Sequence, residues 1–253
     1  MKIGNLALCL PKRMAVMKKT IGILGGMGPE ATAYFFLLLI KNTEAACDQE
    51  HIPVLIWNNP KIPPRTDAIL HKGKSPLPLL REGINILEKG GAGLIVVPCI
   101  TAHYYGPKLQ ARAKVPFVNL LDESLGYTKN YFPGIKKAGL VASSGTVASR
   151  LFHKTFEQAG IEVIAPGQDE QKRVQNAIFG KKGIKAGFTT GAPRKTIIAA
   201  ARRLIRRGAE AIIAGCTEVP LVLEPKDIFV PFIEPMKIGA LACIKMAGYR
   251  IKE

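Results

Sequence analysis

Two cysteines stand at the ends of two similar stretches of this sequence. Residues 91–99 read Gly-Ala-Gly-Leu-Ile-Val-Val-Pro-Cys, and residues 208–216 read Gly-Ala-Glu-Ala-Ile-Ile-Ala-Gly-Cys. A thiolate can take a proton from a carbon and a thiol can return one. Cys99 and Cys216 could therefore invert a stereocentre if they faced one small molecule from opposite sides. A free cysteine is usually a small apolar core residue, but two at matching positions favour the chemical role.

The spacing of the two cysteines recurs elsewhere in the chain. Residue 216 follows residue 99 by 117 positions. The same offset links four pairs of identical residues: Gly22 and Gly139, Gly28 and Gly145, Ala31 and Ala148, Phe35 and Phe152. One offset shared by separate segments indicates an internal duplication. Two similar α/β halves would place both thiols at the carboxyl ends of strands, where open α/β sheets bind ligands.

Apolar runs alternate with helix-forming stretches along the whole chain. The predicted strands cover residues 20–24, 54–59, 91–99, 115–120, 137–143, 161–165, 208–216 and 228–233. The predicted helices cover residues 29–41, 77–89, 121–130, 149–159, 168–179, 193–207 and 235–247. This alternation predicts an α/β fold with parallel sheets.

The composition limits the classes of protein to consider. Of the 253 residues, 47% are hydrophobic and 22% are charged, which is typical of a globular chain. The five cysteines are widely spaced and form no Cys-x-x-Cys motif, so neither a disulfide framework nor a zinc site is indicated, and a cytoplasmic location is expected. The longest apolar run is about half of the roughly 20 residues that a membrane span needs, so we expect no membrane partner.

The net charge of +17 raises the possibility of nucleic-acid binding. The lysines and arginines are scattered, however, and no aromatic-rich basic motif accompanies them, so a basic solvated surface is favoured and no nucleic-acid partner is expected. Residues 1–17 precede a second methionine start and are interpreted as an extension or a misassigned start.

Two loops carry groups that could bind an anion. The Gly-Gly-Met-Gly loop at 25–28 leads into a helix that opens with Pro29, which favours a small anion at the helix start more than a nucleotide. The loop at 143–146, Ser-Ser-Gly-Thr, offers hydroxyl and N–H groups to a carboxylate. A proline-rich loop at 58–67 could hold Arg65 toward a cleft, although a solvated loop arginine is the simpler interpretation.

Five motifs together resemble one known family. They are Gly-Gly-Met-Gly-Pro-Glu-Ala-Thr at 25–32, Ile-Pro-Pro-Arg-Thr at 62–66, Pro-Cys-Ile-Thr-Ala-His at 98–103, Ile-Lys-Ala-Gly at 184–187 and Gly-Cys-Thr-Glu at 215–218. In this order they resemble the aspartate/glutamate racemase family, and within it the aspartate racemase branch. The resemblance extends from residue 19 to about residue 245.

The resemblance implies two α/β domains related by a pseudo-twofold axis, with the active site in the cleft between them. We expect the first domain to comprise residues 18–115 and 224–253, and the second to comprise residues 116–223. It also implies a racemase that needs neither pyridoxal phosphate nor a metal, so no cofactor is expected. Family members of this branch are commonly dimers, and a homodimer is expected.

The resemblance also implies roles for individual residues. Cys99 and Cys216 would be the catalytic acid and base, while Arg65 and Lys185 would hold substrate carboxylates. The residues expected to bind the amino-acid substrate are Met27, Arg65, Thr101, Ala102, Thr146, Lys185 and Thr217. A free thiol has a pKa near 8.5, so the site is expected to favour the thiolate, through helix starts after each cysteine and through the two cations.

Three neighbours of the cysteines leave alternatives open. The family usually has Asn where this chain has Ile100, which raises the prospect of a less polar amino acid or a broader range. His103 could tune Cys99 or simply pack on a helix. Glu218 could orient or protonate near Cys216, or cap the next helix start.

The predicted function is interconversion of L- and D-aspartate by a two-cysteine, two-base mechanism. One alternative is a racemase of another or a broader set of amino acids. Another is a related isomerase or decarboxylase of small carboxylic acids. A third, from a different class, is a catalytically silent basic binding protein.

Overall fold

The computed structural model describes residues 17–253, which form two sheets of four parallel strands each. Cys9 and all but the last residue of the predicted extension at 1–17 lie outside the described residues. The first sheet has the order β2-β1-β3-β4, and the second has the order β6-β5-β7-β8. The strands are β1 (Ile21–Gly25), β2 (Val54–Asn58), β3 (Leu94–Val96), β4 (Phe117–Val118), β5 (Lys137–Val141), β6 (Glu162–Ile164), β7 (Ala211–Ala214) and β8 (Phe232–Ile233).

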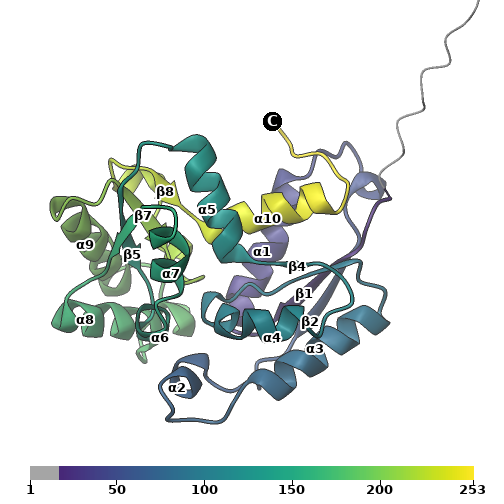
Figure 1. The fold of residues 1–253 in the computed structure, drawn as a ribbon, viewed down its shortest axis with the longest axis horizontal. Coiled ribbons are helices and arrows are strands. Elements are labelled where there is room, and N and C mark those ends of the chain that lie inside the picture. The colour runs from purple at the N-terminus through teal and green to yellow at the C-terminus, as the bar shows by residue number, and fades with distance from the viewer. Residues whose placement is uncertain (1–16) are drawn as a thin grey trace, which may run out of the picture.

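Helices cover both sheets and fill the space between them (Figure 1). They are α1 (Pro29–Asn42), α2 (Arg65–Ile69), α3 (Leu77–Lys89), α4 (Gly106–Gln110), α5 (Leu120–Tyr131), α6 (Ser144–Ala148), α7 (Leu151–Glu157), α8 (Gln168–Phe179), α9 (Ala192–Arg206) and α10 (Pro235–Met246). In the view of Figure 1, α8 and α9 lie on the side of the second sheet, α3 on the side of the first, and α10 with α5 across the middle. The predicted α/β architecture of two parallel-sheet domains is confirmed.

The predicted duplication is visible in the packing of two glycines on the central strands. A Cβ at Gly22 of β1 would come within 2.8 Å of the Cβ of Ala92, so only glycine fits there. A Cβ at Gly139 of β5 would come within 3.1 Å of the Cβ of Ala209. Gly139 follows Gly22 by 117 positions, and Ala209 follows Ala92 by the same number. In both halves, therefore, the turn between a helix and the next strand packs against the same point of the central strand.

The strand register repeats in the same way. Ile21 on β1 pairs with Leu94 on β3, and Ala138 on β5 pairs with Ala211 on β7. These pairs are again 117 positions apart, so the strand that leads to each cysteine lies equivalently beside each central strand. All five residues of β1 are buried, as expected of a parallel strand covered on both faces.

One apolar core joins the two halves. Phe35 from α1, Phe152 from α7 and Met236 from α10 belong to a single buried cluster that also includes residues of β1 and β5. Helix α10 packs against both α1 and α5, which places the last helix of the chain between the sheets. The two halves are therefore held together by burial of apolar surface as well as by contacts at the cleft.

The division of strands between the sheets differs from the predicted domain boundaries. Strand β4, at residues 117–118, pairs with β3 in the first sheet, although residues 116–223 were assigned to the second half. Strand β8, at residues 232–233, pairs with β7 in the second sheet, although residues 224–253 were assigned to the first. The chain crosses between the halves only after each of these edge strands, through α5 and α10.

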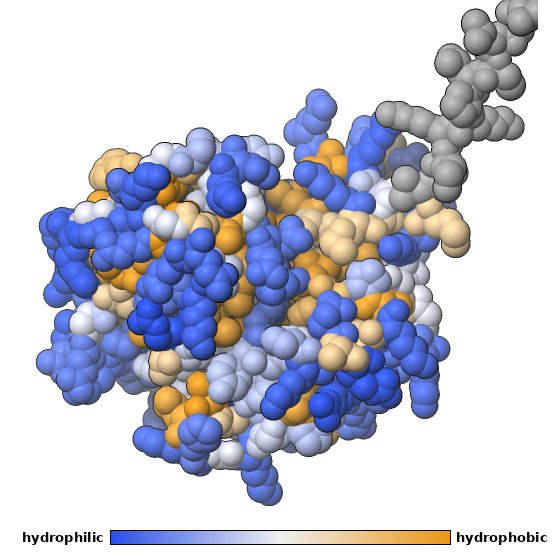
Figure 2. Space-filling view, viewed as in Figure 1, coloured by the Kyte–Doolittle hydropathy of each residue, from blue (hydrophilic) through white to orange (hydrophobic). Residues whose placement is uncertain are grey.

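Other differences are local. The residues after both cysteines form 3-10 turns, Ile100–Tyr105 and Val219–Leu221, rather than the α-helical starts that we expected. The predicted loop at 58–67 ends in α2, which begins at Arg65 itself. Among residues 17–253 no helix combines the length and the apolar character that crossing a bilayer requires. Most of the face in Figure 2 is hydrophilic, in keeping with the net charge of +17.

Candidate active site

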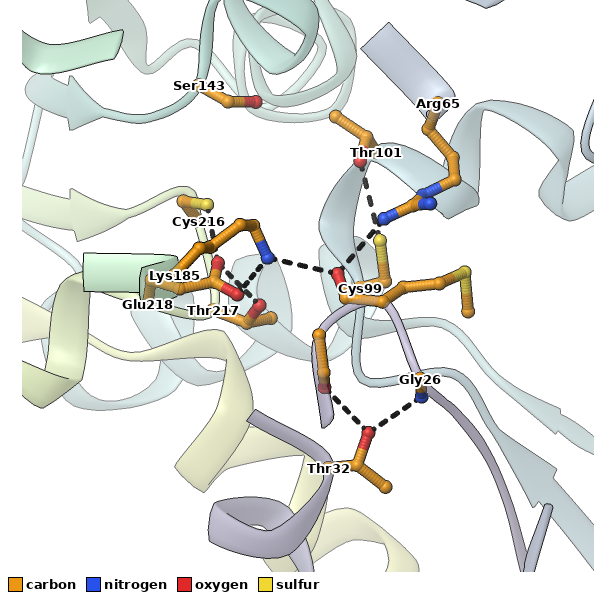
Figure 3. A network of polar contacts seen from close by, with 12 residues as sticks. Gly26, Thr32, Arg65, Cys99, Thr101, Ser143, Lys185, Cys216, Thr217 and Glu218 are labelled. Atoms are coloured by element: carbon orange, nitrogen blue, oxygen red, sulfur yellow. Dashed lines mark hydrogen bonds and ion pairs between the residues drawn. The ribbon is translucent and has the colours of Figure 1, made fainter. Parts of the chain in front are cut away.

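Both predicted catalytic cysteines lie just beyond the carboxyl ends of equivalent strands. Cys99 follows β3 and Cys216 follows β7, and each side chain is buried, with 4% and 7% of the residue exposed. Both line one small cavity between the two halves. Figure 3 shows the two sulfur atoms approaching this space from opposite sides. The structure therefore brings together two thiols that are 117 residues apart in the sequence.

The cavity between the thiols is narrow and adjoins a larger one. Its free volume is only ≈ 10 Å³, whereas the adjoining cavity measures ≈ 620 Å³. The residues that line both cavities are Met27, Arg65, Thr101, Phe179 and Lys185. These five side chains form the boundary across which a small molecule would pass from the outer cavity to the thiols.

Six of the seven residues expected to bind substrate line the inner cavity. They are Met27, Arg65, Thr101, Thr146, Lys185 and Thr217. Ala102 does not: its residue is 0% exposed and packs in an apolar cluster with Leu24 and Leu109. The 3-10 geometry of the turn after Cys99 directs Ala102 into the core while Thr101 faces the cavity.

Cys216 has a carboxylate as its immediate partner. Its Sγ donates a hydrogen bond to Glu218 Oε2 at 2.9 Å, and Thr217 Oγ1 donates to the same oxygen at 3.1 Å. Burial raises the pKa of the Cys216 thiol well above its ordinary value, and the charge of Glu218 adds to this effect. The expectation that the site favours the thiolate is therefore wrong at Cys216, because burial and the neighbouring carboxylate both favour the neutral thiol.

Lys185 is the second partner of Glu218. Its Nζ forms an ion pair with Glu218 Oε1 and also donates to the carbonyl oxygen of Met27 at 3.3 Å (Figure 3). Burial works to lower the pKa of Lys185, but the charge of Glu218 and the hydrogen bond to it, together with the nearby cysteines, outweigh burial, so the pKa is raised. Lys185 therefore carries its positive charge to the space between the cysteines.

Arg65 reaches the same carbonyl oxygen from the other half of the cleft. Its Nη2 donates to Met27 O at 3.1 Å, and its Nη1 donates to the carbonyl oxygens of Ile62 and Pro63 at 3.2 and 3.0 Å. All of these acceptors are neutral, and its buried Nε has no hydrogen-bond partner among the described residues. Arg65 thus has an unused donor, and its hydrogen bonds involve no carboxylate.

The loop that supplies the Met27 carbonyl is held by Thr32. Thr32 Oγ1 accepts a hydrogen bond from Gly26 N at 2.9 Å and donates to Gly28 O at 2.8 Å. Gly26 has a φ of +95°, and a Cβ there would lie 2.3 Å from the backbone carbon of Asn59. The Gly-rich loop is therefore a tight turn that positions a carbonyl beside Arg65 and Lys185.

Cys99 has a different environment from that of Cys216. Its Sγ lies 3.4 Å from Thr101 Oγ1, a hydroxyl that can either donate or accept. His103 does not contact the sulfur. Its Nε2 accepts a hydrogen bond from Leu120 N at 3.1 Å, so its Nδ1 carries the proton and donates to Cys99 O at 3.0 Å.

His103 is thus a packing residue of the Cys99 turn. Burial lowers its pKa, which keeps the ring neutral at ordinary pH. Of the two interpretations that the sequence left open, the structure supports packing. His103 connects the backbone of the Cys99 turn to the backbone at the start of α5.

The inner cavity is also lined by Ser143, Phe179 and Gly215. Ser143 caps α6 by accepting a hydrogen bond from Thr146 N, and the Ser-Ser-Gly-Thr pattern was a usable signal for it. Phe179 was missed, because the last residue of a helix carries no local mark of a distant cleft. Ile100, 2% exposed, also lines the cavity.

Comparison with known proteins decides the family. A family model described as Asp/Glu/Hydantoin racemase matches residues 24–243. The chain belongs to the Asp/Glu/hydantoin racemase family. The resemblance inferred from the five motifs is therefore confirmed.

The chain is similar to two known racemases. The chain is 28% identical over 218 residues to the broad specificity amino-acid racemase RacX of Bacillus subtilis, covering 85% of this chain and 92% of RacX. It is 31% identical to the Picrophilus torridus aspartate racemase, with a TM-score of 0.81 and coverage of 92% of this chain and 96% of that one.

The same fold occurs in a more distant solved structure. The glutamate racemase of Francisella tularensis superposes with a TM-score of 0.66 at 16% identity, covering 90% of this chain and 80% of that one. At this identity the likeness concerns the fold alone. Within residues 17–253 there is no group of three or more His, Cys, Asp and Glu side chains that could hold a metal ion.

Proposed function

We propose that this protein is a cofactor-independent amino-acid racemase in which Cys99 and Cys216 are the two acid/base groups. The observation that carries the proposal is the placement of two buried thiols on opposite sides of one cavity, each at the end of an equivalent strand. Proton removal from one face of a carbon and proton delivery to the other requires that arrangement. Membership of the racemase family supports the same reaction.

In the proposed reaction a thiolate removes the α-proton of the amino acid. The thiol across the cavity then donates its proton to the opposite face of the carbanion, so that one thiol and one thiolate are present before and after. An α-hydrogen is a weak acid, and the carboxylate that takes up charge must be neutralised. Arg65 and Lys185 supply that positive charge at the boundary of the cavity.

Aspartate is the substrate that we propose first. The presence of two cations, Arg65 and Lys185, suits a substrate with two carboxylates, and the similarity to an aspartate racemase supports it. A broader set of amino acids is the second candidate. It is supported by Ile100, which places an apolar side chain beside Cys99, and by the similarity to a broad specificity racemase.

The test is incubation with L-aspartate in D2O under reducing conditions, without pyridoxal phosphate. The α-proton signal is followed by NMR and the optical activity by circular dichroism. We expect both signals to disappear. If both persist, the same assay is extended to glutamate and to less polar amino acids.

Two other results would change the assignment. A new product in the NMR spectrum would indicate the related isomerase or decarboxylase. Unchanged spectra for the whole amino-acid panel would contradict the racemase proposal and would leave the silent binding protein, which salt-dependent nucleic-acid binding would then test.

A further inference from the structure

The two thiols of the cavity differ in the group that each one contacts. Cys216 donates to the carboxylate of Glu218 at 2.9 Å, whereas Cys99 has the hydroxyl of Thr101 at 3.4 Å. An ionised carboxylate can only accept a hydrogen bond, but a hydroxyl can also donate one. The carboxylate therefore favours a proton on Cys216, and the hydroxyl can stabilise a thiolate on Cys99.

Glu218 is itself fixed by two donors besides the thiol. Lys185 pairs with Oε1, and Thr217 donates to Oε2 at 3.1 Å. The Glu218 side chain is only 4% exposed, so water cannot screen its charge from the sulfur. Residue 218 is thus a buried carboxylate with both oxygens occupied, one of them by Cys216.

From this asymmetry we propose that Glu218 is a positioning residue that keeps the proton on Cys216 in the free enzyme and leaves Cys99 as the base. The inference rests on the proposed racemase function. The titratable and charged groups that face Cys216 are Glu218 and Lys185 from its own half and, across the cavity, Cys99 and Arg65. Of these, only Glu218 is a carboxylate.

The proton assignment makes the two directions of the reaction unequal. The enzyme form with a Cys99 thiolate accepts the enantiomer whose α-hydrogen faces Cys99. After turnover the proton lies on Cys99 and the negative charge on Cys216, next to the charge of Glu218. This second form is less stable, because two negative charges then lie close together in a buried site.

The difference between the two enzyme forms must appear as a difference in kcat and in KM between the two enantiomers, and not in kcat/KM. Enantiomers have equal free energies in water, so kcat/KM must be the same in both directions. The enantiomer that binds the less stable form is expected to have a higher KM and a higher kcat by the same factor. Removing the charge of Glu218 should bring both ratios closer to unity.

The first experiment measures the protonation of Cys216 without any turnover. The pH titration of thiolate absorbance in Cys99→Ala, minus that in Cys99→Ala/Cys216→Ala, reports Cys216 alone. Adding Glu218→Gln to Cys99→Ala is expected to lower the midpoint by about one to three pH units, the range for a nearby charge. Glu218→Asp keeps the charge and is expected to leave the midpoint above that of Glu218→Gln.

A matched control removes a carboxylate that does not contact the thiol. Glu162→Gln breaks an exposed ion pair with Lys137 in the same half and should leave the Cys216 midpoint unchanged. Circular dichroism confirms that each variant is folded. If Glu218→Gln does not fold, two other variants still test the contact. Glu218→Asp shortens the side chain that accepts from Cys216, and Thr217→Val removes the hydroxyl that donates to Glu218 Oε2.

The second experiment compares both enantiomers of a turned-over amino acid in wild type and in Glu218→Gln. We expect the ratio of kcat values, and equally of KM values, to fall by roughly tenfold toward unity. An unchanged Cys216 midpoint together with unchanged ratios would overturn the proposal and leave the racemase function intact. A shifted midpoint without turnover of any amino acid would support the Glu218 contact and contradict the racemase function.

Discussion

Lys185 in the second half donates a hydrogen bond to the carbonyl oxygen of Met27 in the first, at 3.3 Å. Arg65 donates to the same oxygen at 3.1 Å. A single carbonyl oxygen thus accepts hydrogen bonds from both cations at the boundary between the inner and outer cavities. Under the proposed function, a substrate carboxylate would accept hydrogen bonds from Arg65 and Lys185 in place of the Met27 carbonyl. Substrate binding would then alter a contact between the halves.

The two cysteines give the most direct prediction. Cys99→Ala and Cys216→Ala should each lower racemisation by about 10²–10⁴-fold, the usual contribution of a general acid or base. Cys47→Ala is the matched control, because Cys47 is exposed and outside the cavity, and it should leave the rate unchanged. The rates are measured by circular dichroism, and wild-type activity in either cavity variant would contradict the two-base mechanism.

Loss of Lys185 should lower the stability of the fold as well as the rate of the reaction. Lys185→Met leaves the buried Glu218 without its cation, and we expect a loss of about 1–3 kcal/mol in the free energy of unfolding. The cost stays below that of a wholly buried pair because 22% of the Lys185 side chain is exposed. Urea unfolding measures it.

The double variant Lys185→Met/Glu218→Gln separates the charge from the packing. It should be less destabilised than the sum of the two single variants, because no uncompensated charge remains. Strict additivity would show that the ion pair contributes nothing to stability.

Ile100 is expected to restrict how polar a substrate can be. Ile100→Asn places an amide beside Cys99 and should raise kcat/KM for aspartate relative to that for an apolar amino acid. Since Ile100 is 2% exposed within an apolar cluster, the variant should also lose about 1–3 kcal/mol of stability. Ile100→Val keeps the apolar character and should leave the substrate ratio unchanged, so an equal change in both variants would refute the polarity argument.

The neutral state of His103 predicts how stability depends on pH. Burial lowers its pKa below the ordinary value of 6.5, so below about pH 6.5 the unfolded chain binds a proton that the folded chain does not. Stability from His103 is complete above this value and is lost progressively as the pH falls toward the folded pKa. His153, whose pKa is also lowered chiefly by burial, acts in the same direction.

Urea unfolding at pH 7.5 and 5.5 should show a lower free energy of unfolding at the lower pH. His103→Gln should reduce the difference between the two values but not remove it, since His153 remains. An undiminished difference would mean that His103 is not held neutral in the folded protein.

The Gly-rich loop should tolerate no side chain at Gly26. Gly26→Ala adds a Cβ only 2.3 Å from Asn59 backbone, so the loop and the Met27 carbonyl must shift and activity should fall. Gly91→Ala is the matched control, since Gly91 has a similar φ of +90° but nothing within 4 Å of the added Cβ. It should lose only the conformational cost of about 1–2 kcal/mol. Equal losses in the two variants would exclude the clash as the cause.

Much of this molecule could be predicted from local patterns. Apolar runs bounded by glycine and proline predict the strands, because a parallel strand buried on both faces needs continuous apolar residues. The offset of 117 positions predicts two matched halves, and with them a pair of thiols, Cys99 and Cys216, at equivalent strand ends. Helices α3 and α8 begin and end at the predicted residues, since their apolar periodicity and flanking glycine or proline are local signals.

Other features were decided only by the tertiary structure. From the sequence, Glu218 could be either a helix cap or a partner of the Cys216 thiol. His103 could either tune the Cys99 thiol or pack on a helix. The outcome depends on which neighbours burial brings close: Lys185, 33 positions before Glu218, and Leu120, 17 positions after His103. Such contacts are set by the packing of separate elements, which no local pattern encodes.

The same reason explains Ala102, Phe179 and the two edge strands. A 3-10 turn instead of an α-helix rotates Ala102 into the core, and the packing of α8 brings Phe179 to the cleft. The pairing of β4 and β8 is settled by the neighbouring strands, because two-residue strands carry too little apolar surface to choose a sheet alone. The sequence by itself determined that two thiols stand at equivalent strand ends, and tertiary packing decided the surroundings that make them different.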